Sequence, residues 1–421
     1  MLAAAQEFRE SAGPACVAAS GVRVGVARLV LTEFRNYRSL RLDLGTGRDP
    51  VPAWGPVVVT GPNGAGKTNL LEAISFLSPG RGLRNARLGD IDRRDETKGD
   101  ETRDAAACWA VAATVETRRG AVAIGTGRDN TAGLQPTGLS RSGERRVIRI
   151  DGEPVRGQAA LAERLGVLWL TPAMDRLFVE GPGGRRRLLD RLVLGLDPTH
   201  ATRVARYEQA LRERARLLRD RTEDAAWLTA AEEIMAAEGV AVAAARRETI
   251  EQLDRVCAAA DGAFPRARLG LIGVVEDWLG RMPALAAEER FKAALVRNRA
   301  SDALAGGAGL GPHRSDLAVV HAEKRIPAEA ASTGEQKALL IAIVLAQAEL
   351  QRAVRGEAPL LLLDEVAAHL DAVRREALFA VLAGLEGQAW ITGTDPALFA
   401  PLRGVARFLS VCDGALSATL C

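Results

Sequence analysis

The sequence lacks the features that mark disulfide-rich, zinc-binding and membrane-spanning proteins. Its 421 residues include five cysteines, which are scattered along the chain, and none of them forms a Cys-x-x-Cys pair. This spacing favours neither a zinc site nor a disulfide framework, as expected in a reducing cytoplasm. No apolar run approaches the roughly 18 residues of a membrane span, and the longest candidate, residues 338–350, is interrupted by Gln347. We therefore expect a cytoplasmic protein without membrane association.

An excess of one charge is also lacking, because the formal net charge is only +3. Such a mild excess does not by itself indicate a nucleic-acid partner. The first residues carry Glu7, Arg9 and Glu10 where a signal peptide needs an apolar stretch. Residues 1–22 are therefore expected to form a loose N-terminal extension.

Three segments of different character follow this extension. Residues 22–180 predict mainly strands with one helix, residues 306–421 alternate apolar strands with helices, and residues 181–305 are rich in Arg, Ala, Leu and Glu and predict long helices at 199–221 and 225–260. In the last segment the alternation favours a mainly parallel α/β sheet, with strands at 317–321, 360–363 and 389–392 and helices at 335–351 and 372–385. In the first segment we expect a helix at 69–77, a loop at 126–143, and strands at 22–31, 40–44, 56–60, 110–116, 120–125, 145–150 and 167–170.

A phosphate-binding loop follows the strand at 56–60. Residues 61–68 read Gly61-Pro62-Asn63-Gly64-Ala65-Gly66-Lys67-Thr68 and fit the pattern G-x-x-x-x-G-K-[ST]. Glycines let backbone N–H groups approach the phosphates, and the next helix, which includes Asn69, presents its positive end to them. Lys67 is expected to neutralise the β- and γ-phosphates of ATP, and the Thr68 hydroxyl to ligand Mg²⁺. The alternative is a chance glycine turn.

Two carboxylates end the leucine-rich strand at 360–363. Asp364 and Glu365 follow four consecutive leucines, so they are expected at the edge of a buried sheet. Asp364 would help to hold Mg²⁺, and Glu365 would position the attacking water or accept its proton. The alternative is a strand that ends in a solvated acidic turn.

The segment Ser332-Thr333-Gly334-Glu335-Gln336-Lys337 lies between these two motifs, directly before an apolar helix. Taken alone, it is a helix N-cap with Glu335 in the first turn. Set between a phosphate loop and an Asp-Glu strand, it resembles the signature motif of ABC-type ATPases. The resemblance implies that Ser332 and the Gly334 amide bind the γ-phosphate held by the opposite subunit. It also implies that Asp371, by position a helix N-cap, belongs to a D-loop that meets the partner.

Within the ABC-type ATPases, residues 24–415 resemble the RecF family of bacterial recombinational-repair proteins. The resemblance implies that Arg35 and Asn36 lie near the base and ribose of the nucleotide. It rests on an ordered set of segments: residues 31–37, 61–69 and 78–84, Thr171-Pro172 with Asp175, Arg186-Arg187 with Leu189-Asp190, Gly311-Pro312-His313-Arg314-Ser315-Asp316, and residues 332–337.

Some positions depart from the pattern of the transporter members. No histidine follows the strand at 389–392, where Thr392 or Thr394 would sense the γ-phosphate instead. No glutamine follows the strand at 167–170, and Asp175 is the candidate for that role. Slow hydrolysis is therefore expected.

The roles of some polar residues stay open at this point. His313 and Arg314 either lie at a dimer interface or near DNA, or they are exposed residues of a Gly-Pro turn. The Arg212, Arg216 and Arg219 side chains share one helical face, which is either a phosphate track or an ordinary solvated face with Glu213, Asp220 and Glu223.

The resemblance implies an α/β ATPase head of the ABC type, with a mixed, mainly parallel sheet and added antiparallel strands, and with residues 181–305 as an inserted helical domain. ATP would bind between two copies, with Lys67 of one facing the partner subunit's Ser332. The dimer would clamp double-stranded DNA, and hydrolysis would release it. The resemblance also implies single-stranded DNA at gaps and junctions, SOS induction, and RecR with RecO as partners. Alternatives are a structural SMC-type head and the nucleotide-binding subunit of a transporter.

Overall fold

The computed structural model describes residues 24–45, 54–93, 108–129, 145–220, 225–412 and 414–418. The chain divides into two compact units, the first from residues 1–172 and 355–421 and the second from residues 173–354. This division differs from the three segments expected from the sequence, which stay a prediction about domains. None of the described helices is long and apolar enough to cross a membrane.

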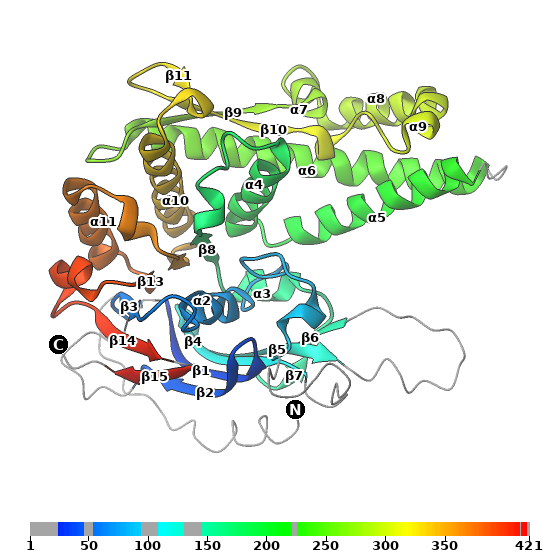
Figure 1. The fold of residues 1–421 in the computed structure, drawn as a ribbon. Coiled ribbons are helices and arrows are strands. Elements are labelled where there is room, and N and C mark those ends of the chain that lie inside the picture. The colour runs from blue at the N-terminus through cyan, green and yellow to red at the C-terminus, as the bar shows by residue number, and fades with distance from the viewer. Residues whose placement is uncertain are drawn as a thin grey trace, which may run out of the picture. The chain divides into compact units, whose positions relative to one another are not determined.

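A mainly parallel sheet forms the centre of the first unit, in the strand order β15-β14-β3-β13-β12-β8 (Figure 1). Strands β3, β8, β12 and β13 are buried along their whole length, which explains their mainly apolar sequences. β3, β8, β12 and β13 match the predicted strands, whereas the last two strands had not been predicted. The bounds are β3 Val57–Thr60, β8 Val167–Leu170, β12 Leu360–Leu363, β13 Ala389–Gly393, β14 Arg407–Cys412 and β15 Ala415–Ala418.

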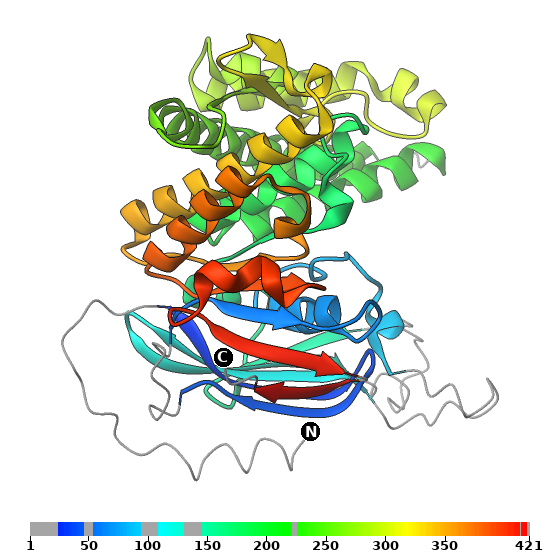
Figure 2. The ribbon, with the colours of Figure 1, turned by 60° about the vertical axis from the view of Figure 1, so that its left-hand side comes forward.

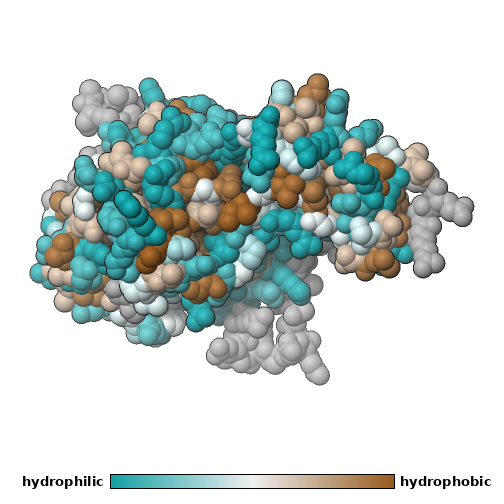
Figure 3. Space-filling model, turned by 90° about the horizontal axis from the view of Figure 1, so that it is seen from above, coloured by the Kyte–Doolittle hydropathy of each residue, from teal (hydrophilic) through white to brown (hydrophobic). Residues whose placement is uncertain are grey.

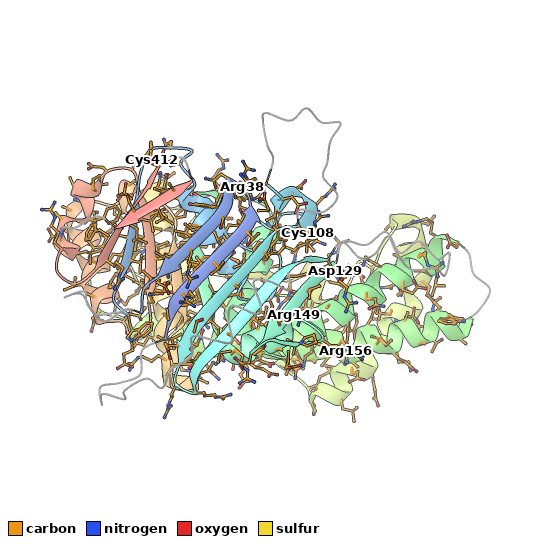
Figure 4. The ribbon with its side chains drawn as sticks, turned by 90° about the horizontal axis from the view of Figure 1, so that it is seen from below. Arg38, Cys108, Asp129, Arg149, Arg156 and Cys412 are labelled. Carbon is orange, nitrogen blue, oxygen red and sulfur yellow. The ribbon has the colours of Figure 1, made fainter. Side chains whose placement is uncertain are left out.

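A second, antiparallel sheet of the same unit has the order β2-β1-β4-β5-β6-β7. Figure 4 shows it from below, with Arg38 on β2 and Arg149 on β6. β5 is longer than expected, since Thr126–Asp129 pair with β6 and were wrongly assigned to a loop; residues 130–143 of that predicted loop lie outside the described residues. The bounds are β1 Gly25–Phe34, β2 Tyr37–Asp43, β4 Ala110–Thr117, β5 Gly120–Asp129, β6 Arg145–Ile150 and β7 Glu153–Pro154.

Helix α2, Lys67–Ser75, contacts both β1 and β13 and therefore lies against both sheets of the first unit. Its side chains from Leu70 to Ser75 are buried. Close to it, Phe34, Phe76 and Trp109 pack their rings at centroid distances of 5.0 to 6.1 Å. The first unit also contains α3, Ala159–Arg164, and α11, Ala372–Gly384 (Figure 2).

The second unit is mainly helical, and its two long helices confirm the predicted ones within two residues at each end. The same unit also contains a small sheet of order β11-β10-β9. The strand at 317–321 had been expected within the parallel alternation, but β10 pairs antiparallel with both neighbours. The bounds are α4 Pro182–Leu196, α5 His200–Arg219, α6 Ala225–Ala259, α7 Val274–Leu279, α8 Ala284–Arg297, α9 Arg299–Ala305, α10 Thr333–Arg355, β9 Ala267–Ile272, β10 Asp316–His321 and β11 Ile326–Pro327.

A buried ion network joins the helices of the second unit. The Arg214 guanidinium, 1% exposed, donates to Glu232 at 3.0 Å, to Asp302 at 2.8 Å and to the Leu295 carbonyl at 2.7 Å. Arg299 adds a second cation to Glu232. Because each buried charge has a partner, the network holds α5, α6, α8 and α9 in one arrangement. An apolar cluster around Tyr207, Met235 and Phe291 lies in the same unit.

Candidate nucleotide-binding site

The phosphate loop is packed so closely that two of its glycines have no room for a side chain. Gly61 has φ 152°, and a Cβ there would lie 2.2 Å from the Val411 carbonyl oxygen. Gly66 has φ 114°, and a Cβ there would lie 2.4 Å from Asn36 Nδ2. Only glycine fits both the positive φ and this close approach. The loop is thus shaped by β14 on one side and by the β1–β2 turn on the other.

Lys67, the first residue of α2, folds over its own loop. Its Nζ donates to the carbonyls of Gly61, at 2.8 Å, and Pro62, at 3.0 Å, and the residue is 4% exposed. An ammonium group has three N–H donors, so one remains for a phosphate oxygen. The position agrees with the predicted role of Lys67.

Three oxygen-bearing side chains meet where β12 and β13 end. Thr68 Oγ1 lies 3.0 and 2.9 Å from the two carboxylate oxygens of Asp364, which is 296 residues away in the sequence. Thr392 Oγ1 donates to Asp364 Oδ1 at 2.7 Å. Parallel strands end at the same edge of a sheet, which explains the convergence. The fold therefore brings together Thr68 and Asp364, the two predicted metal ligands.

Hydroxyl and carboxylate oxygens are the donors that Mg²⁺ prefers, and magnesium is usually held by one or two protein ligands together with phosphates and water. Asp364 is 4% exposed and bonded to two hydroxyls, so its geometry is well held. No group of three or more His, Cys, Asp or Glu suited to a metal occurs among the described residues. The donor set therefore fits a cation that brings its other ligands with it.

Glu365, the predicted catalytic carboxylate, lies in a strained backbone position. Its φ of 51° is in the left-handed region, which costs a non-glycine residue on the order of 1 kcal/mol. Its backbone N–H donates to Thr392 Oγ1 at 2.9 Å, so Thr392 orients both acidic residues. Thr392 is fully buried, whereas Thr394 is exposed.

The β1–β2 turn holds the other side of the loop. Asn36 Nδ2 donates to the Ala65 carbonyl at 3.0 Å, and the Tyr37 hydroxyl donates to the Gly66 carbonyl at 3.0 Å. The Arg35 guanidinium donates to both carboxylate oxygens of Glu72, at 2.9 and 2.7 Å. Asn36 therefore lies at the loop, while Arg35 is held against α2. A nucleotide contact by either residue stays a prediction.

Glu72 was missed by the sequence reasoning, although it is the centre of this region. It is fully buried on α2 and also accepts from Arg84, at 2.7 Å. Arg84 further donates to Asn69, at 2.6 Å, and Asn69 donates to Asn36 Oδ1 at 2.7 Å. A hydrogen-bonded chain thus runs from Glu72 to the phosphate loop. The available signal was one carboxylate inside the apolar run of residues 70–74.

In the second unit, the signature segment begins α10 with a capping box. Ser332 Oγ and N donate to Glu335 Oε2 at 2.9 and 3.1 Å, and the Glu335 N–H lies 3.4 Å from Ser332 Oγ. Lys324 also pairs with Glu335, and these contacts, the lysine first, lower the pKa of Glu335 to about 2. Ser332 and Gly334 are exposed, and open space surrounds the Gly334 Cβ position. The helix end is therefore accessible.

The other predicted positions are placed as follows. The Asp371 side chain accepts from the Arg374 N–H at 2.8 Å and caps α11. Asp175 lies 3.5 Å from Lys337 Nζ, within the second unit. On α5, Arg216 pairs with Glu213 and Asp220, and Arg212 with Glu208, as on an ordinary solvated face.

His313 is half-buried instead of exposed. Its Nε2–H donates to the Ala308 carbonyl at 2.8 Å, and its Nδ1 accepts from the Tyr207 hydroxyl at 2.6 Å. Burial, with smaller effects of nearby Arg314 and Arg186, lowers the pKa of His313. The imidazole is thus held neutral in one tautomer. Arg314 next to it is exposed.

Comparisons with known proteins agree over almost the whole chain. A family model of the RecF/RecN/SMC N terminal domain matches residues 25–402. The chain is 47% identical to the DNA replication and repair protein RecF of Rhizobium meliloti, over 94% of this chain and 99% of that protein. It is 48% identical to the protein of the same name from Mesorhizobium japonicum, over 94% and 98%. A solved structure of the recombination mediator protein RecF-ATPrS in RecFOR pathway superimposes with a TM-score of 0.76 and 21% identity, covering 95% of this chain and 100% of that one.

Proposed function

The chain belongs to the RecF family, and from that premise we propose that it is an ATP-dependent DNA-binding protein of replication and recombinational repair. The observation that carries the proposal is the convergence of Lys67, Thr68 and Asp364 at one edge of the parallel sheet. A phosphate loop with a buried carboxylate next to it is typical of proteins that bind and hydrolyse a nucleoside triphosphate. The signature helix, which is accessible, is typical of members of this class that change state with the bound nucleotide.

ATP, as the substrate, would supply the phosphates and bring Mg²⁺ with them. Lys67 would turn a donor to the β- and γ-phosphates, while Thr68 and Asp364 would hold the metal ion. Glu365 would position the attacking water or accept its proton. The strained backbone at Glu365, bonded to Thr392, supports this role because such strain persists where the surrounding structure enforces it.

The complete site would need a second copy of the chain. The partner subunit's Ser332 and the partner subunit's Gly334 would close over the γ-phosphate, using the exposed end of a helix whose dipole favours an anion. Asp371, at the start of α11, would meet the same partner. ATP would thereby join two copies into a homodimer, and hydrolysis would separate them.

The dimer would clamp DNA, both duplex and single-stranded, at gaps and junctions, and DNA would stimulate its slow hydrolysis. RecR with RecO would act as partners in loading, and the protein would take part in SOS induction. The solved neighbour, a mediator in the RecFOR pathway, supports this assignment to recombination. Residues 22–180 with 306–421 would be the head, and residues 181–305 the helical insertion. A structural SMC head or a transporter subunit is not favoured, because curated relatives that match 94% of the chain are RecF proteins.

Sedimentation of the protein with a labelled DNA duplex, in the presence of ATP, ADP or a slowly hydrolysed analogue, tests the proposal. We expect dimers and DNA binding with ATP and the analogue but not with ADP. Affinity should fall steeply with salt, because phosphate contacts release counterions. A protein that binds ATP yet ignores DNA at low salt, with and without RecR, would refute the repair function.

A further inference from the structure

Helix α4 begins with an unusual concentration of positive charge. Its N-cap is Gly181, which makes no side-chain cap hydrogen bond, and its first turn contains no acidic residue. Three consecutive arginines, Arg185 to Arg187, follow Pro182-Gly183-Gly184. The N-terminus of a helix already carries about half a positive charge. Arginines at this end are therefore unfavourable unless anions compensate them.

Only the first of the three arginines is compensated by a carboxylate. Arg185 makes a two-point ion pair with Asp316, with both distances at 2.8 Å. The nearby Asp190 is engaged by Arg246, at 2.8 and 2.9 Å, and by His200, at 2.8 Å. Both acids are therefore already paired.

A second segment of the chain adds a further cation at this point. Arg186 NH1 donates to the Ser315 carbonyl at 3.0 Å, across 129 residues of sequence, which brings Arg314 beside the start of α4. Within the described part of the chain, the Arg314 side chain donates only to the Ala308 carbonyl, at 3.4 Å. Across the described ranges of the chain, neither Arg186 nor Arg187 nor Arg314 makes an ion pair. The pKa of Arg186 is lowered, first by burial and then by the like charge of Arg246, with Asp316 and Asp190 acting in the opposite direction and Arg314 adding a smaller lowering effect.

The guanidinium groups of Arg186 and Arg187 both reach the backbone of the first turn of α4. The position of a Cβ on Gly183 would be 3.7 Å from Arg187 NH1 and 4.0 Å from Arg186 NH2. Both side chains therefore fold back toward the first turn, and no side chain on Gly183 covers the backbone there. Like charges repel, so an anion placed between the two guanidinium groups would stabilise this arrangement.

We propose that Arg186, Arg187 and Arg314, here named the α4 arginine cluster, bind phosphate groups of the DNA backbone. A guanidinium group matches the geometry of two phosphate oxygens, and free N–H groups at a helix start add donors for the same anion. The cluster brings together the start of α4 and the turn that contains Arg314. Neither segment belongs to the phosphate loop or to the signature helix. The inference rests on the proposed DNA-binding function and assigns part of its contact surface.

The test compares two double variants that remove the same charge. Arg187→Gln with Arg314→Gln removes two cations of the cluster and leaves the Arg186 contact to Ser315 in place. The control, Arg247→Gln with Arg266→Gln, removes two arginines of the same unit that pair with Glu251 and Glu323. Duplex DNA affinity is measured with ATP from about 50 to about 200 mM salt, where each phosphate contact adds about 0.9 to the slope of log affinity against log salt.

We expect the cluster variant to lower this slope by about 2 and to weaken DNA binding roughly tenfold or more at low salt, whereas the control keeps the wild-type slope. Thermal unfolding and ATP titration of both variants should match the wild type. A cluster variant with an unchanged slope overturns the inference while the proposed function stands. Loss of ATP-driven dimerisation by the cluster variant would also overturn the inference and would assign the cluster to nucleotide phosphates. A wild-type protein that binds no DNA would instead remove the proposed function itself.

Discussion

The carboxylate side of the phosphate loop and the start of α10 contrast in how their polar groups are satisfied. At the first, Thr68, Asp364 and Thr392 come from three separate parts of the chain and bond one another in a buried position. At the second, Ser332 and Glu335 are three residues apart and bond each other, with Lys324 as a further partner of Glu335, at an exposed helix end. The first region is thus complete within one copy. The second is a capped helix end that is exposed, so it is accessible to a partner, and its role in a partner's site stays a prediction.

Exposed hydrophobic residues are a weaker guide to function than the polar groups of these two regions. In the space-filling view, hydrophobic residues interrupt the mainly hydrophilic surface in several places (Figure 3). In the second unit, Trp227, Leu285 and Leu304 are 65%, 69% and 92% exposed. Single exposed apolar residues are common on folded domains and do not by themselves indicate a binding surface.

The largest effect is expected from a substitution in the phosphate loop. Lys67→Ala removes the main cation facing the phosphates, so tight ATP binding should disappear, as measured by titration with a labelled nucleotide. Lys324→Ala, which removes a lysine from the second unit, serves as the control and should bind ATP normally in the monomer. Undiminished affinity in Lys67→Ala would show that the loop does not hold the nucleotide.

Next in size is a change that separates binding from chemistry within the same region. Glu365→Gln should bind ATP but hydrolyse it about 10²–10⁴-fold more slowly, because a base or water-positioning group is lost. The variant should accumulate as an ATP-bound dimer in sedimentation. Turnover within about threefold of wild type, well short of that range, would place the base elsewhere.

A change at the start of α10 tests whether that region acts on a partner. Ser332→Arg should leave ATP binding by the monomer nearly normal, yet abolish ATP-driven dimerisation and hydrolysis. Ser332→Asn, which retains a capping side chain, should keep more dimer. Mixing Ser332→Arg with Lys67→Ala should produce one composite site from two intact halves. A Ser332→Arg protein that still dimerises, or that cannot bind ATP alone, would reduce the segment to a capped helix.

A smaller effect is expected behind the phosphate loop. Glu72→Gln removes the buried charge that holds Arg35 and Arg84, so unfolding free energy should fall by about 2 kcal/mol or more. ATP affinity should fall only a few-fold, since the loop still has Asn36 and Tyr37. Urea unfolding and nucleotide titration measure the two effects, with Glu153→Gln on β7 as the control. Unchanged stability would mean that the ion pairs of Glu72 contribute nothing net to folding.

The smallest effect concerns the cap of α10. The folded-state pKa of Glu335, about 2, lies below its usual 4.5, so its contribution to stability is present above pH 4.5 and is lost as the pH falls toward 2. Titration followed by NMR should show this low pKa, and Lys324→Gln should raise it. An ordinary pKa in the wild type would mean that the capping box is not formed.

Local sequence patterns predicted much of the fold. The four leucines of β12 and the apolar strand β3 could be assigned because a strand buried on both faces needs a continuous apolar run. Other elements carried weaker signals. Thr126–Asp129 include Gly127 and were assigned to a loop, although all four residues pair with β6 and the first two also pair with β4, which holds them in β5.

By itself the sequence determined the chemical groups of the nucleotide site and the residue types that begin α10, because glycine spacing and N-cap residues act over a few neighbours. Only the tertiary structure decided that Thr392 bonds Asp364, that Glu72 holds two arginines, and that Arg314 lies beside the start of α4. These contacts join residues 12 to 129 positions apart. Such pairs form because sheet order and helix packing bring them together, and no local pattern along the chain records that order.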